Sequence, residues 1–299
     1  MGAFYYHDDP KKLLKSLYDH IDVDKIEIDA INFHGPAFSA VDNRLLSLEL
    51  LRKGITEAVM FNADANNVLP ASVLYKKNIL TLRGSFRPVT KVNMNMYEES
   101  LKLFLNEKKV DPENTTVIFE MTLNNLKAEG DIDEKDFLDR ARLLCAMGHT
   151  VMISNFQEYY KVVEYFSQHT KAQMGLAMGV NTLTDIFESK YYTHLSGGIL
   201  EAFGKLFFKN LKIYLYPLKE GDTILNSDNL KVEKGMKELY KFFKDNGRVV
   251  DIENYQPEIL DIFSREVHKM IREGEEGWEK SLPEQTSKMI LEEKLFQTS

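Results

Sequence analysis

Short apolar runs alternate with segments of helical spacing along most of the chain. An apolar run bounded by turn residues is typical of a buried parallel strand, and a segment with apolar positions every three or four residues is typical of a helix. This alternation predicts an α/β fold with a doubly wound, mostly parallel sheet covered by helices on both faces. The predicted strands are residues 79–83, 116–119, 149–154, 173–178, 211–216 and 247–251.

The segments between these strands predict helices, and the most polar stretches predict surface loops. Two further helices are expected between the last strand and the C-terminus. The predicted helices are residues 94–107, 134–147, 156–168, 182–208 and 232–245, and the predicted loops are residues 218–229 and 273–284.

The first 76 residues read as a small α/β extension ahead of a main domain at residues 77–299. A leucine-rich helix is expected to end at Gly54, because glycine adopts the left-handed conformation that often terminates a helix. The other elements predicted here are a helix at 11–21, a strand at 25–33, the leucine-rich helix at 43–53 and a strand at 58–61.

Residues 78–93 join the first strand of the main domain to its first helix. Gly84 and Ser85 end the strand, and Pro88 prevents regular hydrogen bonding directly after it. A strand that passes through such a turn into a helix leaves backbone N–H groups pointing at one spot. The turn therefore predicts a phosphate-binding site at the carboxyl end of the strand, where parallel sheets bind their ligands.

Composition and net charge argue against several classes of protein. The chain has 299 residues, 28% charged and 43% hydrophobic, as expected of an ordinary globular protein. Its net charge of −8 argues against a nonspecific nucleic-acid binder. No secretory signal and no apolar run long enough to cross a bilayer is visible. The single cysteine, Cys145, can form no internal disulfide and is expected in the core, which is consistent with a cytoplasmic protein.

Three separated segments carry a family resemblance. They read Arg-Gly-Ser-Phe-Arg-Pro-Val-Thr at 83–90, Leu-Ala-Met-Gly-Val-Asn-Thr-Leu at 176–183, and Ile-Phe-Ser-Arg-Glu-Val-His-Lys-Met-Ile-Arg-Glu-Gly at 262–274. In this order they resemble the motifs of the nicotinate/nicotinamide mononucleotide adenylyltransferases of the HIGH nucleotidyltransferase superfamily. The resemblance covers residues 77–299 and leaves the first 76 unexplained.

The resemblance implies a Rossmann-like fold and a transferase of NAD biosynthesis. Such an enzyme moves AMP from ATP to a mononucleotide, such as nicotinate or nicotinamide mononucleotide, and releases pyrophosphate. It implies Mg²⁺ with the ATP, small-molecule nucleotides as partners and no residue assigned as a metal ligand, and it leaves a homo-oligomer open. The implied catalytic positions are Thr90, Asn93 and Arg265, and the implied nucleotide or phosphate contacts are Gly84, Ser85, Phe86, Arg87, Gly179, Asn181, Ser264 and His268.

Departures from the family pattern keep a second interpretation open. The family's two opening histidines fall on Thr90 and Asn93, its aspartate on Asn181 and its arginine on His268. A neutral amide at position 93 donates a hydrogen bond but no positive charge, which typically lowers a rate by roughly 10²–10³. The alternative is a non-catalytic protein that binds nucleotides or a partner and retains only the fold. Ser264 as a plain helix N-cap and Arg87 as a solvated loop charge are the corresponding structural interpretations.

Overall fold

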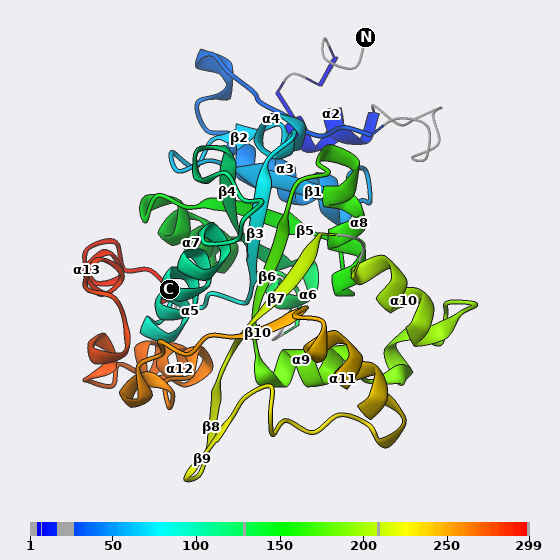
Figure 1. The fold of residues 1–299 in the computed structure, drawn as a ribbon. Helices are drawn as coiled ribbons and strands as arrows, with labels where there is room; N and C mark the ends of the chain where they lie inside the picture. Colours follow the sequence, from blue (N-terminus) through cyan, green and yellow to red (C-terminus); the bar gives the residue numbers. More distant parts are fainter. Residues whose placement is uncertain (1–4, 7, 17–26, 128–129, 208–209, 298–299) are drawn as a thin grey trace. The chain divides into compact units, whose positions relative to one another are not determined.

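The computed structural model describes residues 5–6, 8–16, 27–127, 130–207 and 210–297 (Figure 1). Its main sheet has eight strands in the order β10-β7-β6-β3-β4-β5-β1-β2, and β8 and β9 form a separate hairpin. The strands are β1 (Ala58–Phe61), β2 (Asn67–Val68), β3 (Asn78–Arg83), β4 (Thr115–Thr122), β5 (Thr150–Ser154), β6 (Met174–Gly179), β7 (Leu211–Tyr216), β8 (Leu218–Glu220), β9 (Thr223–Leu225) and β10 (Val249–Asp251).

Helices separate most of these strands along the chain, so the predicted α/β fold with a mostly parallel sheet is confirmed. The helices are α2 (Pro10–Ser16), α3 (Asn43–Arg52), α4 (Pro70–Leu74), α5 (Lys91–Leu105), α6 (Leu123–Leu126), α7 (Glu134–Ala146), α8 (Tyr159–His169), α9 (Val180–Ile186), α10 (Gly198–Leu206), α11 (Lys237–Asp245), α12 (Ser264–Glu273) and α13 (Glu284–Glu293). Among the described residues, no helix has the length and apolar composition that a membrane crossing requires.

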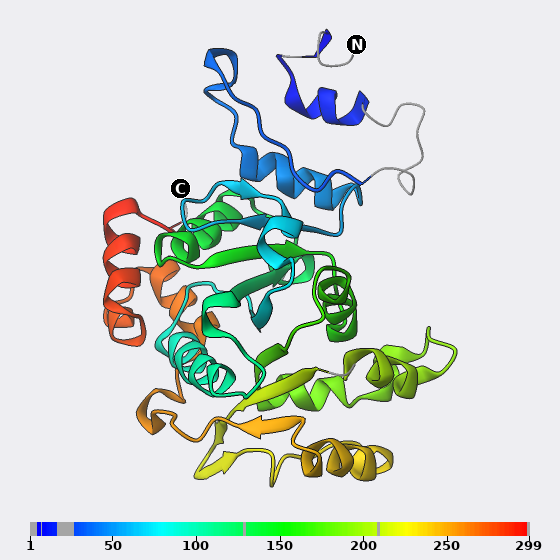
Figure 2. The same cartoon turned by 45° about the horizontal axis from the view of Figure 1, so that its top comes forward.

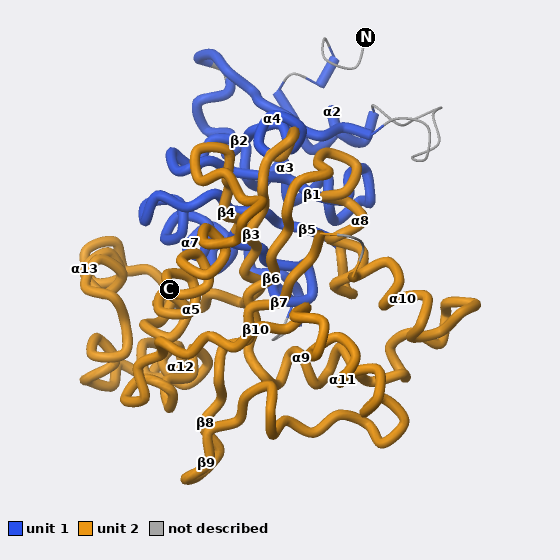
Figure 3. The backbone as a smooth tube through the Cα atoms, viewed as in Figure 1, with its two compact units in different colours: residues 1–73, 119–155 blue, residues 74–118, 156–299 orange. Residues whose placement is uncertain are grey.

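The chain divides into two compact units that alternate along the sequence (Figure 3). Unit 1 comprises residues 1–73 and 119–155, and unit 2 comprises residues 74–118 and 156–299. The predicted boundary at residue 76 lies near the end of the first segment of unit 1, but residues 119–155 also belong to that unit. The division into an extension at 1–76 and a domain at 77–299 stays a prediction.

Unit 1 is built around the apolar face of α3. Leu46 and Leu50 of this helix pack with Leu14 and Ile55 in one buried cluster. The side chain of Asp42 accepts a hydrogen bond from the backbone N–H of Arg44 and caps the start of α3. The predicted end of the helix at Gly54 is confirmed, since this residue follows the C-cap with φ of 68°.

Unit 2 contains four parallel strands, β10, β7, β6 and β3, in adjacent positions. Helices α5, α12 and α13 lie on one side of these strands, and α8 to α11 lie on the other (Figures 1 and 2). The Tyr216 hydroxyl donates to Asn95 Oδ1 at 2.7 Å, and the Phe104 and Tyr214 rings meet edge to face. These contacts hold α5 against β7.

Gly175 in β6 lies where Phe104 of α5 packs closely on the strands. A Cβ atom at this position would lie 2.8 Å from the Tyr214 ring, 3.0 Å from Leu80 and 3.1 Å from Phe104. We expect Gly175→Ala to lower the free energy of unfolding by about 1–3 kcal/mol, because the added methyl overpacks the core. Urea denaturation measures this change.

Gly204→Ala is the matched control, since a Cβ there meets no atom within 4 Å and the residue lies within α10. It is expected to be neutral or to stabilise by up to about 1 kcal/mol, as alanine is the better helix former. Equal effects of the two substitutions would contradict the close packing described for Gly175.

Two predicted elements are wrong. Residues 27–33, the described part of the strand predicted at 25–33, have no regular secondary structure. Their apolar residues Ile28, Ile31 and Phe33 pack against the cluster around α3, so burial rather than strand pairing explains their spacing. The loop predicted at 218–229 instead contains the hairpin β8–β9, in which Glu220 pairs with Thr223.

Other elements differ only in their ends. The helix predicted at 11–21 is α2, and residues 17–21 lie outside the described residues. The helix predicted at 94–107 begins earlier, at Lys91, because Thr90 caps it. The helical segment predicted at 182–208 is divided into α9, a short 3₁₀ turn and α10. These differences leave the order of strands and helices in the main domain unchanged.

Candidate functional site

The strand order reverses between β3 and β6. The chain goes from β3 to β4 on one side, and later places β6 on the other side of β3. In open α/β sheets, ligands bind at such a reversal, beyond the carboxyl ends of the strands. Leu82 pairs with Ala177, so Gly84 and Gly179, each two residues further on, lie at the same level. Neighbouring strands are about 4.8 Å apart, and the first two motifs are therefore adjacent.

The turn after β3 is closed by the side chain of Phe86. A Cβ atom on Gly84 would lie 3.1 Å from Phe86 Cζ, so the ring covers the glycine and leaves room for no larger residue without movement. Phe86 itself has φ of 46°, an uncommon backbone conformation for a residue other than glycine. Ser85 and Arg87 on either side are half-buried. The turn is thus held by its own aromatic side chain.

Thr90 and Asn93 form a capping box at the start of α5. Asn93 Oδ1 accepts hydrogen bonds from the Thr90 backbone N–H and hydroxyl, both at 3.0 Å. The Thr90 hydroxyl in turn accepts from the Asn93 backbone N–H at 3.4 Å, and Thr90 is only 1% exposed. The Asn93 side-chain N–H groups bond to none of the described residues. The box therefore occupies the Thr90 hydroxyl but leaves the Asn93 amide as a donor.

Ser264 brings the third motif to the first. Its hydroxyl donates to the Pro88 carbonyl oxygen at 2.9 Å, which joins the start of α12 to the turn after β3. The N-cap of α12 is Phe263, which provides no side-chain cap, so the interpretation of Ser264 as a plain N-cap is wrong. An uncapped helix start leaves backbone N–H groups that can bind an anion. Segments 176 positions apart in sequence thus meet at one edge of the strands.

The remaining predicted residues differ in their surroundings. Arg265 is exposed in the first turn of α12, and Asn181 is exposed in the first turn of α9, two residues after Gly179. A Cβ atom on Gly179 would meet nothing within 4 Å, so the space beside it is open. His268 is 5% exposed and its ring meets the Phe296 ring edge-on at 6.0 Å. The structure therefore brings Gly84 to Asn93, Gly179 and Ser264 together, and packs His268 into the interior.

Arg83 makes a contact that the sequence pattern did not indicate. Its guanidinium lies 4.2 Å above the Tyr159 ring and donates to the Gln157 carbonyl oxygen at 3.1 Å. These two contacts join the end of β3 to the start of α8, so Arg83 has a structural role next to the turn. No local signal identifies this pair, because Arg83 and Tyr159 lie far apart in the sequence.

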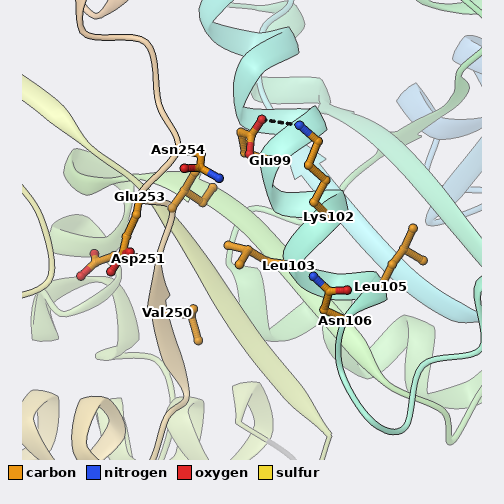
Figure 4. A pocket seen from close by; sticks show the side chains of 10 residues that line it. Glu99, Lys102, Leu103, Leu105, Asn106, Val250, Asp251, Glu253 and Asn254 are labelled. Atoms are coloured by element: carbon orange, nitrogen blue, oxygen red, sulfur yellow. Dashed lines mark hydrogen bonds and ion pairs between the residues drawn. The ribbon is translucent and has the colours of Figure 1, made fainter.

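Two pockets of unit 2 lie away from these residues. One, of about 690 Å³, lies between α5 and the segment that begins in β10. Figure 4 shows Glu99 and Lys102 of α5, paired at 2.6 Å, on one side of it and Asp251, Glu253 and Asn254 on the other. The second pocket lies beyond the C-terminal end of α5. None of the predicted site residues lines either pocket.

The described residues provide little evidence for a metal site or for a reactive thiol. Among the described residues, no three His, Cys, Asp or Glu side chains are grouped so that they could hold a metal ion. Cys145 is buried in α7, as predicted, and burial raises the pKa of its thiol to about 11. A thiol with that pKa carries little thiolate at neutral pH and is a poor nucleophile.

The strand reversal, the glycine turn and the uncapped helix start together define an α/β protein with a candidate anion-binding edge. No protein-family model and no curated protein matches the chain. Among solved structures, it is similar to Plasmodium falciparum nicotinic acid mononucleotide adenylyltransferase complexed with NaAD. The identity is 16% and the TM-score 0.44, over 74% of this chain and 97% of that one.

The same Plasmodium falciparum enzyme complexed with APC is similar over the same shares of the two chains, at 14% identity and a TM-score of 0.43. Because both TM-scores lie below 0.5, these similarities add nothing to the assignment of the fold, which follows from the strand order.

Proposed function

We propose that unit 2 binds ATP and a mononucleotide, such as nicotinate or nicotinamide mononucleotide, at the carboxyl ends of β3 and β6. It transfers AMP to the phosphate of the mononucleotide and releases pyrophosphate. The observation that carries this proposal is the hydrogen bond from Ser264 to Pro88. Together with the register of β3 and β6, it supports one nucleotide site made from three separate motifs.

The proposed roles follow from what each group can donate. Backbone N–H groups at Gly84 to Phe86 and at the uncapped start of α12 bind phosphate oxygens. Arg87 and Arg265 supply positive charge, and the Asn93 amide donates to a phosphate while Thr90 fixes the start of α5. Gly179 and Asn181 lie at the nucleoside.

Such transfer is catalysed by positioning and charge neutralisation rather than by a protein nucleophile.

The residues present do not form a magnesium site of their own. None of the predicted site residues carries a carboxylate, and position 181 is an asparagine. Magnesium in phosphoryl-transfer sites is held largely by substrate phosphates, with one or two protein carboxylates. Mg²⁺ therefore enters this proposal only as part of the ATP substrate, and no step is assigned to it. The reducing cytoplasm, consistent with a lone buried cysteine, is the proposed compartment.

One observation favours the non-catalytic alternative. The side-chain oxygens of Thr90 and Asn93 are both used in the capping box. Because these are the positions at which the family pattern has histidines, the structure of the helix start accounts for both residues without catalysis. In this alternative, unit 2 binds a nucleotide at the same edge and transfers nothing.

Pyrophosphate release distinguishes the two functions. The full chain is incubated with Mg²⁺, ATP and a panel of mononucleotides, and ATP binding is measured separately by calorimetry. Release with one acceptor supports the transferase. Measurable ATP binding without release from any acceptor overturns the transferase and supports the alternative.

The site itself is tested by ATP affinity. We expect Arg87→Ala and Ser264→Ala each to raise the Kd for ATP roughly tenfold or more. The first removes a charge from the phosphate cradle, and the second removes the hydrogen bond that joins the start of α12 to the turn after β3. Arg272→Ala is the matched control, since this arginine is exposed in the last turn of the same helix, α12. Unchanged affinity in both site variants would show that ATP binds elsewhere or not at all.

A further inference from the structure

A pocket lined by charged and polar residues lies at the opposite end of the parallel strands. This pocket, of about 540 Å³, is lined by residues that precede β6 and β10, by the start of β7 and by the segment after α5. Its volume falls in the usual range for small-ligand sites. Since the candidate nucleotide edge is at the carboxyl ends of the same strands, this pocket is a separate feature of unit 2.

Positive charge dominates the lining of this pocket. Four cations, Lys108, Lys109, Lys212 and Arg248, face one carboxylate, Glu107. Lys212 pairs with Glu107 at 2.5 Å, so this carboxylate is already balanced. The chain as a whole carries a net charge of −8, and such a cluster therefore runs against its overall charge. A local positive field in a concave site attracts anions.

Lys108 and Lys109 are not neutralised by Glu107, which pairs with Lys212. Both are exposed, and neither forms an ion pair with any described residue. Arg248 is held in place differently, because its guanidinium donates to the Leu211 carbonyl oxygen at 3.1 Å. The pocket thus combines a fixed planar donor with two adaptable ammonium groups, which is a set suited to phosphate oxygens.

Gln173 is the second, independent observation. It lines the pocket and is only 9% exposed, and its side-chain amide bonds to none of the described residues. Its amide atoms are not fully buried and therefore remain accessible from the pocket, where they can bond to a ligand in place of water. A ligand with acceptor atoms in the pocket would satisfy this amide.

We propose that this pocket binds a small soluble polyanion that carries phosphate groups. Lys108, Lys109 and Arg248 bind its charged oxygens, and the Gln173 amide donates to an oxygen at the buried end. The ligand class follows from the charge and volume of the pocket and does not depend on the activity proposed for the other edge.

Calorimetry with inorganic tripolyphosphate tests the proposal on the full chain at low salt. The Lys108→Glu/Lys109→Glu variant is expected to lose at least tenfold in affinity for this site, and Gln173→Met roughly three- to tenfold. Affinity should also fall at high salt, because exposed charges are screened.

The matched control is Lys237→Glu/Lys241→Glu, which changes the net charge equally at two exposed positions of α11 outside the pocket. Arg87→Ala separates this site from the candidate nucleotide edge. Both of these variants should keep the binding that the Lys108/Lys109 variant loses.

Equal affinity in the Lys108/Lys109 variant and its control overturns the proposal, as does the absence of binding at millimolar tripolyphosphate. Loss of the same binding event in Arg87→Ala would assign it to the nucleotide edge and also overturn it. Circular dichroism of each variant confirms that the fold is intact. Failure of ATP turnover in the separate pyrophosphate assay leaves all these outcomes unaffected.

Discussion

An Asn93→His variant is expected to release pyrophosphate from ATP roughly 10²–10³ times faster than the unaltered protein. Asn93 donates from a neutral amide, whereas a protonated imidazole would bring positive charge to phosphates that gain charge in the transition state. The capping box directs this side chain back to Thr90, the last residue of the first motif. A coupled pyrophosphate assay with each mononucleotide measures the effect.

The substitution also removes the oxygen that accepts from Thr90, so thermal melting must show that α5 remains folded. Asn246→His is the control, because this exposed asparagine follows α11, outside the site. An unchanged rate in a folded Asn93→His variant that binds ATP would favour the non-catalytic alternative.

Asp136→Asn is expected to lower the free energy of unfolding by roughly 3 kcal/mol or more. Asp136 pairs with Arg140 one turn further along α7, and both are buried, at 8% and 1% exposure. Arg140 also donates to the Asn125 carbonyl oxygen at 3.1 Å. The amide removes the negative charge next to a guanidinium that stays in a low-dielectric environment. Urea denaturation followed by far-ultraviolet circular dichroism measures the loss.

Glu134→Gln in the same helix is the control for an exposed pair. Its partner is Lys11, and the two side chains are 42% and 63% exposed. Removing such a pair typically costs less than about 1 kcal/mol. If the two substitutions destabilised the protein equally, burial would not be what gives the Asp136–Arg140 pair its importance.

Local pattern was sufficient for the strands that unit 2 contributes to the main sheet. The runs at 79–83 and 211–216 agree with β3 and β7 within one residue, because strands buried on both faces are continuously apolar. Pairing partners were a different matter. β5 pairs antiparallel with β1 through residues such as Val151 and Phe61, and no pattern within either strand specifies the other.

The two wrongly predicted elements have different physical reasons. Ile28, Ile31 and Phe33 have the spacing of a strand, yet they serve an apolar cluster and need no ladder. In the hairpin of β8 and β9, Gly221 has φ of 59° and begins a two-residue Gly-Asp turn, a strong hairpin signal that the polar surroundings masked. Burial outweighed periodicity in the first segment, and turn geometry outweighed polar composition in the second.

The candidate site could be predicted only in part. The order of the three motifs indicated one site, and the register of β3 with β6 and the Ser264 hydrogen bond agree with that arrangement. The contact of Arg83 with Tyr159 and the interior position of His268 depend on packing between distant segments. A motif indicates which residues belong to one site, but it does not indicate which distant residues their side chains contact.

The chain passes between the two compact units after residues 73, 118 and 155. No single cut can therefore yield either unit whole. A shortened chain that began at residue 77 would keep β5 without β1, its antiparallel neighbour. An uncovered strand edge of that kind is a template for aggregation. Deleting the N-terminal segment would thus remove one part of unit 1, whose other part is residues 119–155. The two units should therefore be studied by point substitutions or in a rejoined chain, and not by truncation.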